Sequence, residues 1–298
     1  MYLGIEIGGT KLQLGLGDGN GVIHALWRGA VVPADGADGI RKQIGDAIPE
    51  LLANANRKRD ELRGIGIGFG GPVDDATRTV IKSHQIAGWD GFPLADWVAD
   101  LVGVPAVLGN DADVAGLAEA LFGAGKGLSP IFYITIGSGI GGGLIINGEI
   151  YRGCGVGAAE FGHLWAIDNG HCEPLEVFAS GWGMTDQMSH RTGGRNYSAV
   201  EIVRLSKSGD QNAQAVLHGA ITQLAWAICH VVALLCPRRI VIGGGVSLMG
   251  EELLFKPLRE RVSQWVFRPF AGFYDIVAAE LGEEVVVHGA LALARKSG

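Results

Sequence analysis

The chain has 298 residues, enough for about two domains with buried cores. Its formal net charge of −7 argues against a protein that wraps nucleic acid or lies on an anionic membrane, because both surfaces attract basic proteins. Its 49 glycines are scattered between apolar runs, which indicates many tight turns rather than disorder. No secretory signal is recognised after Met1, so we expect a cytoplasmic protein.

The first part of the chain alternates between strand and helix patterns. We expect strands at residues 2–7, 12–17 and 22–32, then a helix over 38–57. A buried strand at 64–69, a short helix at 93–102 and a strand at 104–108 follow. Strands that precede helices at these intervals predict an α/β fold with a central mixed sheet covered by helices.

The second part repeats this plan. A helix is expected over 112–122, strands at 131–136, 143–146 and 240–242, and an irregular loop region over 151–174. The apolar stretch 219–236 contains Thr222, Gln223 and His230, which favours a buried helix over a membrane span. The last helix, 288–296, is expected to pack back on the first domain.

We place the domain boundary near Gly109. The first domain then comprises residues 1–108 plus about 284–298, and the second comprises residues 109–283. Because ligands commonly bind between domains, we expect the corner at Asn110 and Asp111 to lie in a cleft.

Two glycine-rich turns occur, one in each half of the chain. Gly8-Gly9-Thr10 follows the first strand, and the segment 137–142 (GSGIGG) follows the strand at 131–136. Glycine lets the backbone approach a ligand closely and turn its N–H groups toward it. A single such turn is more often a plain hairpin. The matched pair predicts that a polyphosphate is held from two sides.

Several polar side chains suit phosphoryl transfer to a sugar. Asp111, at a helix start beside a strand end, can accept the proton of a hydroxyl, although an ordinary helix cap is the alternative. Asn110 offers a donor and an acceptor beside it. Glu160 and His163 are three residues apart and suit two sugar hydroxyls; a metal ligand or a structural role for His163 is the alternative. Glu176 lies a short loop later and can complete a ring of acceptors.

The motifs together resemble the ROK family of repressors, open reading frames and sugar kinases. They are 4–11 (GIEIGGTK), 70–73 (GGPV), 88–89 (GW), 109–112 (GNDA), 137–143 (GSGIGGG), 160–163 (EFGH) and 242–246 (IGGGV). The resemblance covers essentially the whole chain. It implies the two-domain actin-like ATPase and sugar kinase fold, which is ribonuclease H-like, with an interdomain cleft. It also implies ATP-dependent phosphorylation of a hexose hydroxyl, the 6-OH of glucose or of an N-acetylated hexosamine.

The resemblance also implies a role for each matching residue. Asp111 would be the general base. The sugar contacts would be Gly71, Asn110, Asp111, Glu160, His163 and Glu176. The ATP contacts would be Gly8, Gly9, Thr10 and Lys11 in the first turn, Gly137, Ser138, Gly139 and Gly141 in the second, and Gly243, Gly244 and Gly245 beside the adenosine. ATP and Mg²⁺ are the implied cofactors, and the implied assembly is a homodimer or homotetramer without nucleic acid or membrane.

Two substitutions depart from the family pattern. Glu6 stands where the family usually has an aspartate that holds magnesium through water, and we expect the longer acid to hold it in the same way. Asp113 replaces an asparagine two residues after the base. This second carboxylate would either raise the pKa of Asp111 by repulsion or face solvent.

A third departure concerns zinc. Many relatives bind zinc with the histidine of the EFGH-type motif and three cysteines. The shortened loop here offers only His163, His171 and Cys172, and the adjacency of the last two is awkward for a tetrahedral site. We therefore expect no zinc.

Two other functions are compatible with these residues. A catalytically weak sugar-sensing protein is kept open by Glu6. The other is a transcriptional regulator of the same family that lacks its DNA-binding domain, because a first turn that begins at residue 8 leaves no room for a winged helix ahead of it.

Overall fold

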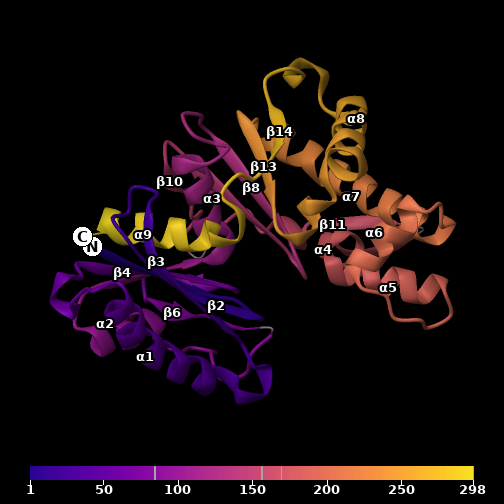
Figure 1. Ribbon diagram of the computed structural model, residues 1–298. Helices are drawn as coiled ribbons and strands as arrows, with labels where there is room; N and C mark the ends of the chain where they lie inside the picture. The colour runs from indigo at the N-terminus through magenta and orange to yellow at the C-terminus, as the bar shows by residue number, and fades with distance from the viewer. Residues whose placement is uncertain (84, 156, 169, 298) are drawn as a thin grey trace. The chain divides into compact units, whose positions relative to one another are not determined.

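The computed structural model describes residues 1–83, 85–155, 157–168 and 170–297 of the chain. It divides into two compact units (Figure 1). The first unit comprises Met1–Gly127, Gly143–Ala158 and Glu280–Gly298, and the second comprises Leu128–Gly142 and Ala159–Ala279. Each unit combines a sheet with covering helices, so the predicted α/β class is confirmed.

The first unit is built on a five-stranded sheet in the order β3-β2-β1-β4-β7. Its strands are β1 (Tyr2–Ile7), β2 (Lys11–Gly17), β3 (Ile23–Ala30), β4 (Gly64–Phe69) and β7 (Ala106–Asn110). β1 pairs antiparallel with β2, and β2 with β3, while β4 runs parallel to β1 and β7 parallel to β4. The carboxyl ends of β1, β4 and β7 therefore meet at one edge of the sheet.

Helices cover both faces of this sheet (Figure 1). α1 (Gly36–Asn54) and α2 (Leu94–Val102) lie on one face, and α3 (Asp111–Phe122) and α9 (Val285–Ser297) on the other. The smaller elements are β5 (Val73–Asp74), β6 (Thr79–Val80) and 3₁₀ turns at Pro33–Asp35, Arg59–Glu61 and Gly282–Glu284. These bounds agree with the predicted ones to within a few residues, apart from the small β5–β6 hairpin, for which no strands were predicted.

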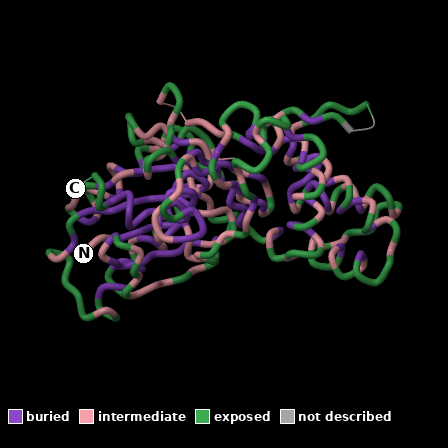
Figure 2. The backbone as a smooth tube through the Cα atoms, turned by 90° about the horizontal axis from the view of Figure 1, so that it is seen from above, coloured by how far each residue is buried: buried purple, intermediate pink, exposed green. Residues whose placement is uncertain are grey.

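Helix α9 lies directly on the sheet because glycines remove the side chains between them. A Cβ atom on Gly66 of β4 would lie 1.8 Å from the Ala290 carbonyl oxygen, and one on Gly289 would lie 1.9 Å from the Val114 carbonyl oxygen of α3. The strands and inner helix faces form the buried core (Figure 2). The C-terminal helix is thus a central part of the first unit.

A second five-stranded sheet has the order β10-β9-β8-β13-β14. Its strands are β8 (Ile131–Ile136), β9 (Ile140–Ile146), β10 (Glu149–Ile150), β13 (Arg239–Gly243) and β14 (Asp275–Ala278), of which β8, β13 and β14 are parallel. The helices of the second unit are α4 (Leu175–Ala179), α5 (Gly181–Arg191), α6 (Ala199–Lys207), α7 (Gln211–Leu235) and α8 (Lys256–Trp265). Short turns are 3₁₀ at Phe161–His163, Gly245–Met249 and Arg268–Phe270 and π-helical at Glu251–Phe255.

Helix α7 is long and apolar enough to cross a membrane by length and composition. In the structure 61% of its most apolar window is buried, and it packs against α8, α4 and α6 within the second unit. The predicted buried helix is therefore found, and its hydropathy is that of a core helix.

Two features differ from expectation. The region 151–174, expected to be irregular, contains a hairpin of β11 (Trp165–Asp168) and β12 (His171–Pro174), with residues 156 and 169 outside the described part. Residues 109–127 and 143–158 belong to the first unit rather than the second, because α3 packs on α9 and on β4 and also contacts β10. The return of the C-terminal helix to the first unit is as expected.

Candidate active site

The first glycine turn joins β1 to β2 at the edge where the parallel strands end. The Gly8 N–H donates to the Lys11 carbonyl at 3.0 Å, and the Thr10 carbonyl accepts from the Val31 N–H at 3.0 Å. Gly70 lies beside the turn, since its N–H donates to the Ile7 carbonyl at 2.8 Å. The turn is therefore firmly attached to the sheet, at the edge where β1 and β4 end.

Asn110 and Asp111 lie at the same edge, where β7 passes into α3. Asn110 caps the helix: its Oδ1 accepts from the Ala112 N–H at 2.9 Å, and its Nδ2 donates to the Gly71 carbonyl at 3.0 Å. The Asp111 Oδ1 accepts from the Ala112 N–H at 2.8 Å. A Cβ atom on Gly70 would lie 3.4 Å from Asp111 Oδ2. The predicted residues Gly71, Asn110 and Asp111 are thus brought together.

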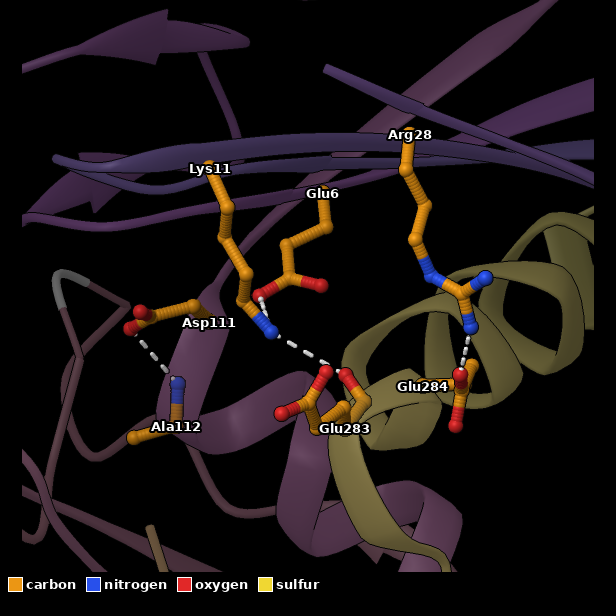
Figure 3. A network of polar contacts seen from close by, with 7 residues as sticks. All are labelled: Glu6, Lys11, Arg28, Asp111, Ala112, Glu283 and Glu284. Carbon is orange, nitrogen blue, oxygen red and sulfur yellow. Dashed lines mark hydrogen bonds and ion pairs between the residues drawn. The ribbon is translucent and has the colours of Figure 1, made fainter. Parts of the chain in front are cut away.

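Buried Glu6 and partly exposed Lys11 form an ion pair beside this corner (Figure 3). Glu6 is 5% exposed, and its Oε1 lies 2.9 Å from Lys11 Nζ, which also donates to the Glu283 carbonyl at 3.0 Å. Burial raises the pKa of Glu6 from 4.5 to about 7, the Lys11 ammonium opposes that rise, and the Asp111 carboxylate adds to it. Asp111 is therefore close enough to affect the protonation of Glu6.

These residues fit a hydrated magnesium ion. Glu6 Oε2 is buried and has no hydrogen-bond partner among the described residues. A buried carboxylate oxygen in that state is costly unless it acquires a partner, and the water shell of a cation supplies donors. Lys11 faces Glu6 instead of the turn, so its predicted contact with ATP requires the ion pair to open.

Asp113 does not face solvent. It is 6% exposed, and its Cα would lie 3.0 Å from a Cβ atom on Gly143. Of the two expectations for this carboxylate, solvent exposure is therefore wrong.

The second glycine turn, between β8 and β9, is held by the start of α5. The Gly181 N–H donates to the Gly137 carbonyl at 2.8 Å, and the Trp182 N–H to the Ser138 carbonyl at 3.2 Å. Gly141 lies in β9, and Gly139 faces Glu176: its Cβ atom would lie 3.0 Å from Glu176 Oε2. Glu176 Oε2 also accepts from the Ile140 N–H at 3.4 Å.

Glu160 and His163 lie together in the same unit. His163 Nδ1 is 3.7 Å from Glu160 Oε2, and both side chains are more than half exposed. Phe161 anchors the segment, because it is buried and packs edge-on against Phe132 of β8. Both polar side chains are therefore available to a ligand while the backbone between them is fixed.

Among the described residues, no group of three or more His, Cys, Asp or Glu side chains has the arrangement of a metal site. Hydrogen bonds hold the hairpin that contains His171 and Cys172. Gln223 Nε2 of α7 donates to the Ile167 carbonyl at 3.1 Å, and the Leu175 N–H donates to the Leu164 carbonyl at 2.8 Å.

Gly243, the last residue of β13, and Gly244 are required by close packing on β8. A Cβ atom on Gly243 would lie 2.5 Å from Tyr133 Oη, and one on Gly244, whose φ is +83°, would lie 2.5 Å from the Ile136 carbonyl. Gly244 therefore lies beside the residue that leads into the second glycine turn. Gly245 follows without such a contact.

Gln85 lies directly over the first glycine turn, although none of the sequence motifs singles it out. Its Oε1 would lie 1.4 Å from a Cβ atom on Gly9, so its amide rests directly on the first turn. A glutamine in a loop carries no periodic or motif signal, and only its placement over Gly9 identifies it. Its position lets it contact a ligand of that turn.

The comparisons with known proteins agree with this geometry. The family model described as "ROK family" matches residues 2–297. The chain belongs to the ROK family. It is 30% identical to a glucokinase of Halalkalibacterium halodurans over 97% of this chain and 93% of that one, and 30% identical to a glucokinase of Thermotoga maritima over 99% and 97%.

Solved structures of the ROK family have the same fold. The structure of a Streptomyces griseus glucokinase in complex with glucose and AMPPNP covers 99% of both chains at 31% identity and a TM-score of 0.81. A Thermus thermophilus ROK hexokinase covers 100% of this chain and 99% of its own at 26% identity and a TM-score of 0.85. The predicted two-domain actin-like fold is confirmed, and the full-length likeness to glucokinases places the chain among the ATP-dependent sugar kinases of the family.

Proposed function

We propose that this chain transfers the γ-phosphoryl group of ATP to a hexose or hexosamine hydroxyl, the 6-OH of glucose or of an N-acetylated hexosamine. Relatives named glucokinase and N-acetyl-D-glucosamine kinase support the substrate class. The observation that carries the proposal is the junction of β7 and α3. There Asp111 lies beside Gly70 and the first glycine turn, while Asn110 performs the capping.

Asp111 acts as the general base in this proposal. Its carboxylate accepts the proton of the sugar hydroxyl as that oxygen attacks the γ-phosphorus, and ADP leaves. Asn110 and the Gly71 backbone, which hydrogen-bond each other, position the sugar beside the base. Glu160, His163 and Glu176 of the second unit bind further sugar hydroxyls.

The glycine turns supply backbone N–H groups to the ATP phosphates. Gly9 and Thr10 serve from the first unit and Ser138 to Gly141 from the second, since the N–H groups of Gly8 and Gly137 are already bonded within their turns, and Gly243 to Gly245 border the adenosine. Glu6 would hold the water shell of the magnesium ion that accompanies ATP, and such an ion would offset the charge of the phosphates. Closing of the protein around both substrates excludes water, so that hydrolysis does not compete.

A coupled ADP-release assay against glucose, mannose, fructose and the N-acetylated hexosamines tests the proposal. We expect turnover with at least one of them. The variant Asp111→Ala should retain less than about a tenth of the wild-type rate while sugar binding, followed by calorimetry, stays measurable. Asp100→Asn, an exposed acid on α2, is the control and should behave as wild type. A rate above that level in Asp111→Ala would exclude Asp111 as the base.

A catalytically weak sugar sensor is the second candidate. The observation that favours it is the substitution at Glu6, whose carboxylate is buried and already paired with Lys11. Calorimetry that finds sugar binding in the wild type, together with no ADP release for any sugar in the panel, would support the sensor and reject the kinase.

A further inference from the structure

The Glu119 carboxylate is the most completely enclosed acidic group in the described part of the chain. It lies on α3 with 0% exposure. Its Oε2 accepts from the Ala124 N–H at 2.8 Å, and its Oε1 accepts from the N–H groups of Glu280 at 3.0 Å and Leu281 at 2.9 Å. The two oxygens thus bind two segments of chain that are far apart in sequence.

These two segments lead to two of the four places where the chain passes from one unit to the other. The chain first leaves the first unit after Gly127, just beyond Ala124, and it returns for the last time at Glu280, with residues 143–158 as an intermediate return. The main chain of Glu119 strengthens the first attachment, because its carbonyl accepts from the Gly123 and Gly125 N–H groups at 3.1 and 2.9 Å. One residue therefore fastens the outgoing and the returning segment to the same helix.

The surroundings of the Glu119 carboxylate shift its pKa in both directions. Burial raises the pKa of Glu119, and the N–H groups of Leu281, Ala124 and Glu280 counteract the rise by hydrogen-bonding the carboxylate. An acid at a buried position is costly without such donors. Ordinary stabilisation of the C-terminal turn of α3 would explain the bond from Ala124, but the bonds from Glu280 and Leu281 span 161 and 162 residues.

We propose that Glu119 is a positioning residue whose carboxylate joins the outgoing and returning segments into one pivot for the closing of the protein on its substrates. Helix α3 begins at Asp111, so the pivot is fixed to the helix that carries the proposed base. Hinge segments control both the rate of many kinases and the exclusion of water from their substrates. This inference rests on the proposed kinase function.

The test uses Glu119→Gln in the full chain. The amide retains one acceptor oxygen and replaces the other with an NH₂ group, which repels the backbone N–H that it faces. Glu61→Gln is the matched control, since Glu61 also accepts a backbone N–H, from Lys58, but at the surface. Three quantities are measured: hydrogen exchange of the Ala124, Glu280 and Leu281 amides without substrate, kcat, and the ADP released per sugar phosphorylated.

In Glu119→Gln we expect these three amides to exchange at least about tenfold faster, while the amides of β1 and β4 keep their wild-type rates. We expect kcat to fall about tenfold and the ADP released without sugar phosphorylation to rise severalfold, because incomplete closing admits water. Glu61→Gln should leave both readouts unchanged. A merely structural role of Glu119 would change stability without changing the ratio of ADP to sugar phosphate.

Gly123→Ala is the second variant and decides the outcome if Glu119→Gln does not fold. A Cβ atom at Gly123 would lie 2.2 Å from Glu119 Oε2, so the methyl group displaces the carboxylate without removing it. The pivot would be overturned if the three amides exchanged faster while kcat and the ratio of ADP to sugar phosphate stayed unchanged. Unchanged exchange of the three amides would overturn it as well. If the wild type phosphorylates no sugar, the proposed function fails, while the exchange measurement still reports whether Glu119 holds the two segments.

Discussion

The sequence alone could not show which of Asn110 and Asp111 caps the helix and which is placed to serve as a base. Both residue types cap helices, and both can contact a sugar. The structure shows that Asn110 occupies the cap position, with its Oδ1 directed at Ala112 and Asp113. Asp111 therefore stands one residue inside the helix, where a negative charge is favoured by the helix dipole. The motif located this corner, and the cap position distinguishes the two residues within it, even though both side chains accept from the Ala112 N–H.

Glu6 should make the stability of the protein depend on pH. Its pKa is raised by burial to about 7, so between about 4.5 and 7 the folded chain holds a proton that the unfolded chain has released. Its contribution to stability is therefore fully present below pH 4.5 and is lost as the pH rises through 7. Over this window we expect the free energy of unfolding of wild type, relative to Glu6→Gln, to fall by about 3 kcal/mol.

Urea unfolding of both proteins at several pH values measures this difference. Glu149→Gln is a suitable control because Glu149 is a surface acid in the same unit, with its side chain 72% exposed. A difference between wild type and Glu6→Gln that stays constant from pH 4.5 to 7 would show that Glu6 titrates in its ordinary range.

At the scale of elements, the strands and core helices followed from the sequence, and the β11–β12 hairpin did not. The strands of the first unit are apolar runs bounded by glycine, which are the strongest local signals. The hairpin exposes Trp165 and Ile167, by 62% and 68%, so no pattern of buried residues marks it. Gln223, which fastens it, lies far away on α7. Such a contact depends on tertiary packing and leaves no local trace.

Gln223→Leu should loosen the hairpin. The substitution removes the donor to the Ile167 carbonyl, and a single neutral hydrogen bond contributes about 1 kcal/mol. We expect faster hydrogen exchange in residues 165–174 and a free energy of unfolding lowered by about that amount. Gln214→Leu is the control, because Gln214 on the same helix donates to the Ser206 carbonyl at 3.3 Å instead. Equal exchange of the hairpin in the two variants would argue against the anchoring role.

Gly289→Ala and Gly45→Ala form a second matched pair on helices. A methyl group at Gly289 would collide with the Val114 carbonyl, so the packing of α9 against α3 must shift, at a cost of about 3 kcal/mol. Gly45 of α1 has no atom within 4 Å of its Cβ position, and alanine there should add about 0.5 to 1 kcal/mol through helix propensity. Urea unfolding measures both, and equal effects of the same sign would contradict the close contact of α9.

For the whole molecule, the fold class, the actin-like fold and the return of the C-terminal helix could be predicted from motif order, whereas the limits of the two units could not. Asn110 and Asp111 follow a strand of the first unit, so a break near Gly109 was reasonable. The packing of α3 on α9 moves residues 109–127 into the first unit. That contact joins segments about 170 residues apart, beyond the range of any local signal.

Deletion of residues 280–298 should unfold the first unit selectively. It removes α9, whose Val286, Val287, Ala290 and Leu291 are buried in the core, and the two N–H groups held by Glu119. We expect limited proteolysis to cut residues 1–127 rapidly while the segment 159–279 persists. The full chain, digested in parallel, should resist at both places. Protection of residues 1–127 in the truncated chain would show that α9 is dispensable.

The central place of α9 has a consequence for biosynthesis. A ribosome makes the 19 residues of Glu280–Gly298 after every segment of the second unit, so the segment that completes the first sheet's cover emerges after that unit. The parts that form the second unit, by contrast, have all been made by Ala279. The nascent chain therefore has an incomplete first unit while its second unit is already able to fold. During that interval β1, β2 and β4 expose the apolar surface on which a chaperone would act.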